Sequence, residues 1–469
     1  MKELLDLKQF RDRLYSIFPY RADAIMNLLD AVSSDTTARS PAELSLNPAF
    51  GRAYPSLYDA VDTLSRLPGQ ADAASERSPL EPAARRVVAG VLPAPAARPF
   101  WLFALDGLSL GRLHAATLSD RSFVHQSNLV GGKTPVTIGH AYSLVVNLPE
   151  AQAMAEPPWA IPLSAQRAPT WRGLLEVGAE QIKDLASDPE LPWYGQLMAV
   201  VIDSAYSVVP FLGPVSDAPN VVAISRLRSN RVLYALPPPR EAGKRGPPRL
   251  YGEPFKLGDA TTRPAPDEVW EFEDLSRGGR AFTVQIRVWH NLIMRGGAAK
   301  PGPLDVLQVV CTGPDGEPLY RRPLWLAVSG ARRAEIAAPL VYDAFRQRFD
   351  QEHFHRFARQ RLLLDAFQTP DTAREVAWMF LVCLAYAQLF AARNVAERWP
   401  RPWERYHQPK AGVPASPATV QRDFGRIIGQ IGTPARPAKP RGKAPGRVKG
   451  MSPGTRKRRK VVQKSRKVA

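Results

Sequence analysis

The first hundred residues carry apolar side chains at helical spacing. Such side chains recur every three or four residues, first at Leu14, Ile17 and Phe18 and then at Ile25, Leu28 and Leu29. Pro79 and Pro82 interrupt a later Ala-rich segment, and no alternating pattern typical of strands competes with the helical one. We therefore expect a helical N-terminal domain over residues 1–98.

After residue 98 the pattern changes to short, continuous apolar runs. These runs cover residues 100–105, 142–148, 198–202 and 221–224. Their length is typical of strands, and apolar residues at successive positions indicate strands that are buried on both faces of an α/β sheet. Residues 99–236 are predicted to form the first half of an α/β domain.

A β-rich region follows a boundary rich in proline. Residues 237–266 contain eight Pro and four Gly, which interrupt regular structure. Beyond this boundary the apolar residues alternate, as expected for half-buried strands, at Phe282, Val284, Ile286 and Val288 and again at Leu324, Leu326 and Val328. This pattern predicts a β-rich segment over residues 237–330. Helical composition returns at residues 339–367 and 375–393, so the α/β domain is expected to resume over 331–395.

Composition narrows the class of protein. The chain has 469 residues, and 45% of them are hydrophobic, which excludes a chain that is disordered throughout. Its two cysteines, Cys311 and Cys383, form neither a disulfide framework nor a zinc-binding pattern, which indicates an intracellular, cytoplasmic protein. The longest apolar stretch, residues 378–392, contains Gln388 and at about 15 residues is shorter than a bilayer-spanning helix. We expect no membrane association.

Most of the positive charge lies at the C-terminus. The net charge is +19, and residues 436–469 contain fourteen Lys or Arg and no acidic residue. We interpret residues 396–469 as a basic tail, disordered at least from residue 436, because like charges and frequent prolines prevent collapse. Such an arm binds polyanions through counterion release, and its densest run is Arg456, Lys457, Arg458, Arg459 and Lys460. The alternative is a tail that only solubilises the protein.

Two of the apolar runs end on an acidic residue, Asp106 and Asp203. If the two strands are neighbours, these carboxylates face each other, and like charges at that distance require a divalent cation between them. The competing interpretation is that each aspartate caps a helix or belongs to a turn.

A third carboxylate lies in the predicted helix at residues 345–359. At 100° per residue, one stripe of this helix contains Arg348, Glu352, His355 and Arg359. Glu352 could complete a metal site with the two aspartates, while Arg348 and Arg359 hold phosphates beside it. A surface ladder of ion pairs gives the same pattern. For His355, and for His140 in the first half of the domain, a structural role is expected.

These residues resemble a known family. Asp106, Asp203 and Glu352 are similar to the acidic triad of DDE transposases of bacterial insertion sequences, and Phe345-x2-Arg348-x3-Glu352-x6-Arg359 resembles their Tyr-x2-Arg-x3-Glu-x6-Lys signature. Phe and Arg replace the first Tyr and the last Lys. Further similarity lies in Asp120-Arg121, in residues 136–143, which include His140 and Tyr142, in Asp203-Ser-Ala-Tyr206, and in Arg226-Leu-Arg228-Ser-Asn-Arg231.

The resemblance implies a ribonuclease H-like mixed sheet flanked by helices and interrupted by the β-rich insertion. The 149 residues between Asp203 and Glu352 leave room for that insertion. By the same resemblance, Asp106, Asp203 and Glu352 bind two Mg2+ or Mn2+ ions, about 3.5 to 4 Å apart. The enzyme then cuts the element ends and joins them to target DNA.

The resemblance also implies partners. They are double-stranded DNA at the transposon ends and the target, bound by the N-terminal domain, by the tail and by Arg228, Arg231, Arg348 and Arg359. A dimer in the DNA complex and a nucleoid-associated location follow.

Three other functions compete with transposition. A nuclease on the same fold would use the same carboxylates without strand transfer, and a domesticated DNA-binding protein would use none of them. A nucleotide-hydrolysing motor is suggested by residues 131–134, which resemble the end of a phosphate loop. The sequence is less compatible with this function, because Ser127 stands where the first glycine of that loop is required.

Overall fold

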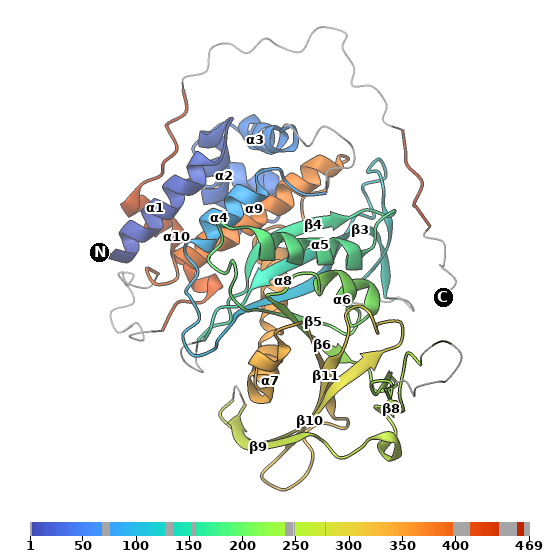
Figure 1. Cartoon of the computed structure of the whole chain (residues 1–469). Helices are drawn as coiled ribbons and strands as arrows, with labels where there is room; N and C mark the ends of the chain where they lie inside the picture. The colour runs from blue at the N-terminus through green and yellow to red at the C-terminus, as the bar shows by residue number, and fades with distance from the viewer. Residues whose placement is uncertain are drawn as a thin grey trace.

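A large mixed sheet organises the chain (Figure 1). The computed structural model describes residues 2–67, 76–126, 135–151, 156–239, 247, 249–276, 278–396, 413–439 and 457–463. In the described residues the strand order is β2-β3-β1-β5-β6-β12-β11-β10-β7-β8, with β4 paired to β3 and β9 to β10. The α/β fold class is therefore confirmed.

The core of the sheet comes from the runs that the sequence marks as apolar. Its strands are β1 (Trp101–Gly111), β2 (Ser122–His125), β3 (Val136–Asn147), β4 (Ile161–Ala168), β5 (Met198–Ile202) and β6 (Val221–Leu227). Strands β1, β5 and β6 run parallel, and β1 pairs antiparallel with β3. Helices α5 (Leu174–Ser187) and α6 (Val209–Val215) connect these strands.

The β-rich segment continues this sheet. It contains β7 (Val232–Tyr234), β8 (Pro254–Lys256), β9 (Glu268–Leu275), β10 (Ala281–Met294), β11 (Leu304–Thr312) and β12 (Leu324–Ser329). Strand β12 pairs antiparallel with β6, so the ladder of backbone hydrogen bonds passes from one region into the other without a gap. In Figure 1 these strands extend below the rest of the molecule. The chain then returns through α7 (Ala338–Gln347) and α8 (Asp350–Arg361).

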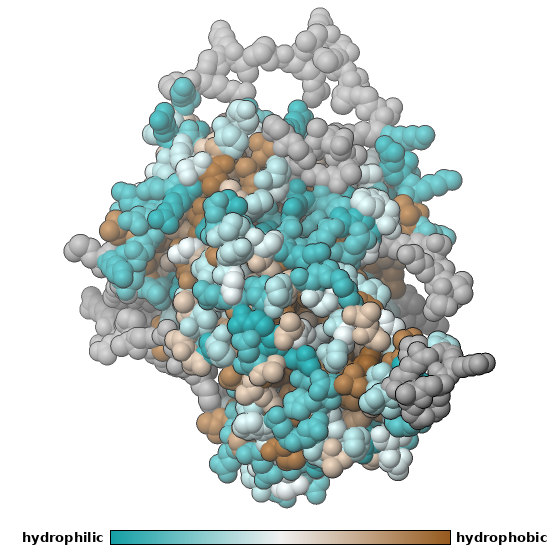
Figure 2. Space-filling view, in the orientation of Figure 1, coloured by the Kyte–Doolittle hydropathy of each residue, from teal (hydrophilic) through white to brown (hydrophobic). Residues whose placement is uncertain are grey.

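Helix α9 (Thr372–Ala391) is the centre of the helical part. Strand β4 and the N-terminal helices pack against it, and these helices are α1 (Lys2–Ser16), α2 (Ala22–Ser34), α3 (Pro55–Ser65) and α4 (Glu81–Ala89). Helix α9 has 20 residues, more than the apolar stretch in the sequence, and is long and apolar enough to cross a membrane. However, 89% of its most apolar window is buried inside the protein. On the face that Figure 2 shows, the apolar residues form small separate patches among hydrophilic ones. Helix α9 is therefore a core helix.

A buried ion pair explains the polar residue inside α9. The Arg11 guanidinium donates hydrogen bonds to both Asp30 carboxylate oxygens, at 2.6 and 2.9 Å, and to the Gln388 amide oxygen at 3.0 Å. Gln388 in turn donates to Asp30 and Ser33. Arg11, Asp30 and Gln388 are each at most 1% exposed. The three side chains thereby join α1, α2 and α9 in a single arrangement.

The tail begins later than residue 396 and is not free where it is described. Helix α10 (Pro417–Ile431) packs on α2 and α9 and buries Val420, Phe424 and Ile427 completely. Further on, residues 457–463 lie beside β2, where Val462 forms a parallel bridge with Ser122. These described residues depart from the expected disorder. Residues 440–456 and 464–469 lie outside the described part of the chain.

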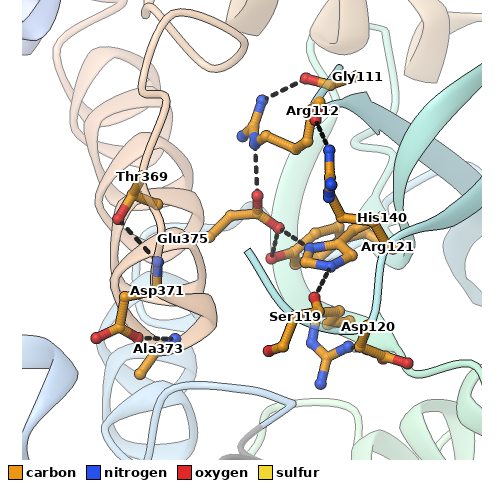
Figure 3. A network of polar contacts seen from close by, with 12 residues as sticks. Gly111, Arg112, Ser119, Asp120, Arg121, His140, Thr369, Asp371, Ala373 and Glu375 are labelled. Atoms are coloured by element: carbon orange, nitrogen blue, oxygen red, sulfur yellow. Dashed lines mark hydrogen bonds and ion pairs between the residues drawn. The ribbon is translucent and has the colours of Figure 1, made fainter. Parts of the chain in front are cut away.

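A second buried polar cluster fixes α9 to the sheet (Figure 3). The Glu375 carboxylate accepts hydrogen bonds from Arg112 Nε at 2.5 Å and from the Tyr142 hydroxyl at 2.9 Å, and it contacts His140 Nδ1 at 2.7 Å. Burial raises the pKa of Glu375. His140 and Arg112 outweigh this effect through their charges and hydrogen bonds and lower the pKa to about 2. His140 therefore has the structural role expected from the sequence.

Replacing Arg11 by Met should destabilise the protein by about 3 to 5 kcal/mol, because the Asp30 carboxylate is then buried without its partner. The free energy of unfolding, measured in urea, checks this. Arg13→Met is the matched control, because Arg13 lies exposed on the same helix; it should change stability by less than about 0.5 kcal/mol. Equal effects of the two substitutions would contradict the importance of the buried pair.

Replacing Glu375 by Gln should cost about 3 kcal/mol at pH 7. Because the pKa of Glu375 is depressed in the folded state, its contribution is complete above the unfolded pKa near 4.5 and is lost as the pH falls toward 2. The difference in unfolding free energy between the variant and the unaltered protein should therefore shrink over that interval. Glu190→Gln, at a carboxylate that is 64% exposed, serves as the control. A difference independent of pH would refute this linkage.

Candidate active site

The two aspartates lie side by side in adjacent parallel strands. Leu105 of β1 pairs with Ile202 of β5, and the residues that directly follow these two are Asp106 and Asp203. Asp203 directly follows the end of β5, as expected. Asp106 does not end its strand, because β1 continues to Gly111. The expectation that the strands are neighbours is thus confirmed, whereas the position of Asp106 at a strand end is corrected.

The negative charge of Glu352 acts on the Asp106 carboxylate. Burial raises the pKa of Asp106, the Gly107 N–H and Arg348 oppose the rise, and the negative charges of Asp203 and Glu352 add to it. Asp203 and Glu352 are therefore both within electrostatic range of Asp106. Glu352 itself lies in the first turn of α8 and is exposed. Within the described part of the chain, no three His, Cys, Asp or Glu side chains are close enough to form a complete metal site. The carboxylates form an open cluster.

The donor chemistry of this cluster fits a hard divalent cation. Carboxylate oxygens are the ligands that Mg2+ and Mn2+ prefer. The mutual repulsion of the three acids is the interaction that a bound cation relieves. Asp106, Asp203 and Glu352 are the side chains here that could supply oxygen ligands to such a cation.

The signature segment folds as two helices. At Arg348 and Phe349 the backbone remains helical, but the amides of Arg348 and Phe349 donate to carbonyls three residues back. This tight turn separates α7 from α8 and replaces the single helix expected from the sequence. It brings Arg348 toward the sheet, where the residue is only 7% exposed.

Arg348 is directed at the aspartate. Its Nη1 lies 4.0 Å from the Asp106 carboxylate, and its guanidinium lies over the rings of Phe345 and Phe349, at 5.5 and 4.8 Å from the ring centroids. Phe345 is buried and packs against Arg348, a role that needs an aromatic ring and no hydroxyl.

Arg359 has a different setting. Its Nη2 donates to the Ser109 carbonyl on β1 at 2.7 Å, and its Nε lies 3.5 Å from the Asp365 carboxylate. It therefore joins α8 to the strand that carries Asp106. Burial and the charge of Arg359 lower the pKa of His355 to about 4, so this ring is neutral at pH 7.

The two arginines after β6 also differ. Arg231 donates to the Ser207 carbonyl at 2.9 Å and so holds the turn that follows Asp203. Arg228 is exposed just beyond the end of β6. Arg226, exposed on β6, directly follows Ser225, the residue that pairs with Ile202 of β5, and so lies beside Asp203. Arg226 and Arg228 are thus two exposed cations near this edge.

Tyr206 belongs to the site, although the sequence assigned it no role. Its amide donates to the Asp203 carbonyl at 3.0 Å, and this turn points the ring back into the protein. Its hydroxyl is buried and interacts with the Ser143 side chain. Burial and the charges of Asp106 and Asp203 raise the pKa of Tyr206, so the hydroxyl stays protonated beside both aspartates. The signal in the sequence was its spacing of three residues from Asp203.

Two sequence-predicted elements lie elsewhere. Lys457, Arg458, Arg459 and Lys460 are exposed beside β2, away from the carboxylates, and Arg456 lies outside the described residues. The segment that resembles a phosphate loop, residues 131–134, is also outside them.

Comparison with known proteins identifies the family. No curated protein matches the chain. A family model described as DDE superfamily endonuclease matches residues 13–291, more than half of the 469 residues. The match includes Asp106 and Asp203 and ends before Glu352. The chain thus belongs to the DDE superfamily endonucleases.

Proposed function

We propose that this protein is a DNA transposase of an insertion sequence, which cuts the element ends and joins their 3′-hydroxyls to target DNA. The observation that supports this best is the register of β1 and β5, which puts Asp106 and Asp203 side by side, with Arg348 Nη1 at 4.0 Å from Asp106. Family membership accounts for the endonuclease chemistry. Strand transfer is the further step proposed here.

Each residue has a role in the proposed mechanism. Asp106, Asp203 and Glu352 would hold the cations, and Arg348, at 4.0 Å from Asp106, limits the repulsion between the carboxylates in their absence. When bound, two Mg2+ or Mn2+ ions supply Lewis-acid activation of the attacking oxygen and stabilisation of the leaving oxygen. Because the attacking oxygen belongs to water or to a DNA 3′-hydroxyl, and displaces the leaving 3′ oxygen in line, the protein forms no covalent intermediate with DNA.

Other side chains position the substrate. Arg226 and Arg228 are exposed beside Asp203, where they can contact phosphates of double-stranded DNA. Arg231 and Arg359 act indirectly, because their guanidinium groups bind backbone carbonyls of the site. In the proposed complex two copies of the chain hold the two element ends, in the cytoplasm and on the nucleoid.

Replacing Asp106 or Asp203 by Asn, or Glu352 by Gln, should lower the rate of Mg2+-dependent cleavage of element ends at least about 1,000-fold, because each removes a charged ligand. DNA affinity in EDTA should stay within about threefold. Cleavage is measured on a labelled duplex carrying the terminal repeat that flanks the reading frame. Glu335→Gln, at a half-exposed carboxylate paired with Arg332, is the control and should retain full activity. Full cleavage by Asp106→Asn would exclude this site.

A second measurement separates a transposase from a simple nuclease. Pre-cut element ends with free 3′-hydroxyls, incubated with an unlabelled target duplex and Mg2+, should yield joined product. The same three substitutions should remove that product. Cleavage of ends without any joined product would identify a nuclease on this fold and contradict strand transfer.

A further inference from the structure

The loop between β1 and β2, residues 112–121, is held by buried polar contacts (Figure 3). The guanidinium of Arg121, which is 5% exposed, donates to the carbonyls of Arg112, Leu113 and Ala116 at 2.9, 3.3 and 3.2 Å. The Ser119 carbonyl lies 2.9 Å from His140 Nε2, in the cluster around Glu375. The carbonyls of this loop are therefore held in fixed positions.

The basic segment of the C-terminus binds to this loop and to the edge of the sheet. The Arg459 amide donates to the Ala116 carbonyl at 3.1 Å, and the Val462 amide donates to the Arg121 carbonyl at 2.8 Å. Val462 also forms a parallel bridge with Ser122, the first residue of β2. Strand β2 is the last strand of the sheet on this side, paired only with β3 among the named strands. Residues 457–463 therefore lie against this edge of the sheet and meet it at one bridge, the kind of contact that strand addition uses.

This mode of docking uses the backbone and leaves the charges free. Lys457, Arg458, Arg459 and Lys460 are all exposed, and both recorded hydrogen bonds to the loop come from main-chain amides. The β-branched Val461 and Val462 follow, and Val461 is half-buried. Four exposed cations are thus carried by a segment that is anchored through other atoms.

The loop that holds this segment follows the strand that carries Asp106. Beyond Asp106, strand β1 continues to Gly111 and leads directly into the anchoring loop. The six residue steps from Asp106 to Arg112 span roughly 20 Å, which is about six base pairs of duplex. Arg359 and Arg112 connect the two places, since Arg359 binds Ser109 on β1 and contacts the Asp365 carboxylate, while Arg112 donates to the Asp365 carbonyl.

We propose that residues 457–463 bind duplex DNA while docked on β2, as a fixed part of the phosphate-binding surface and not as a free arm. The proposal rests on the proposed function only in taking duplex DNA as the ligand. It assigns a role to Asp120 and Arg121 that the cleavage chemistry does not use. Arg121 holds the loop that binds the tail, while Asp120 pairs with Arg167 at 2.5 Å and so fixes the start of β2.

Docking is tested by disulfide formation in the full-length protein. A Ser122→Cys, Val462→Cys pair should crosslink under mild oxidation at least about ten times faster than a Ser122→Cys, Val461→Cys pair, because successive side chains of a strand point to opposite faces. Both native cysteines are buried and should not compete. Peptide mapping identifies the products. Equal rates for the two pairs would show that the tail moves freely and would overturn the proposal.

The role in DNA binding is tested with the crosslinked pair itself. Affinity for a 30-base-pair duplex is measured in EDTA, without divalent cations, for the oxidised and the reduced forms. Locking the tail should leave the affinity within about threefold and the salt dependence unchanged. Changing Lys457, Arg458, Arg459 and Lys460 to Gln should lower the slope of log affinity against log salt by about two to four.

The remaining outcomes overturn the proposal. A tenfold loss of affinity on locking would mean that the arm must leave β2 to reach DNA, and an unchanged slope in the four-Gln variant would mean that these cations do not contact phosphates. Since no assay here involves cleavage, these failures are distinct from a failure of the carboxylate substitutions.

Discussion

The parallel pairing of β1 with β5 is the constraint on which the site depends. Once Leu105 is paired with Ile202, the two aspartates that follow lie next to each other. Any fold with this strand pairing therefore places two negative charges together. A slip of one residue would turn one of the carboxylates to the opposite face of the sheet. The continuous apolar sequence of β1 and β5, buried from both sides, secures the register with many residues that take no part in the chemistry.

The site nevertheless remains open. Glu352 comes from a helix that follows the long β-rich segment, and its exposure contrasts with the buried Arg348 four residues earlier. Because of the tight turn at Arg348 and Phe349, one short segment contains both a buried arginine that faces the sheet and an exposed glutamate that faces solvent. DNA and cations therefore have access to a cluster whose supporting residues are rigid.

The sequence predicted those parts of the fold that apolar patterns determine. Strand β5 was delimited correctly, and β6, β10 and β12 were placed, because their core positions are apolar. Strand β4 was missed, since Ser164, Gln166 and Arg167 are buried there as partners of distant side chains. Helix α10 was assigned to the tail because the charge and proline content of its surroundings outweighed its own apolar stripe.

The site was predictable to a similar extent and for similar reasons. Carboxylates after apolar runs, and a polar stripe on a helix, indicate which residues meet, but they do not show what each guanidinium binds. Arg231 and Arg359 were expected to contact DNA, yet both hydrogen-bond backbone carbonyls, and a carbonyl partner leaves no trace in a sequence. For Tyr206 the sequence offered only its spacing of three residues from Asp203, whereas the burial of its hydroxyl is visible only in the folded chain.

Helix α9 also has a consequence for how the chain is made. The first three helices bury their apolar faces against a helix that begins more than 300 residues later and that α10 completes. During synthesis from the N-terminus, those faces stay exposed until nearly the whole polypeptide has left the ribosome. A ribosome that stops early would release a product whose leading helices lack their partner, and such a product is prone to aggregate or to be degraded.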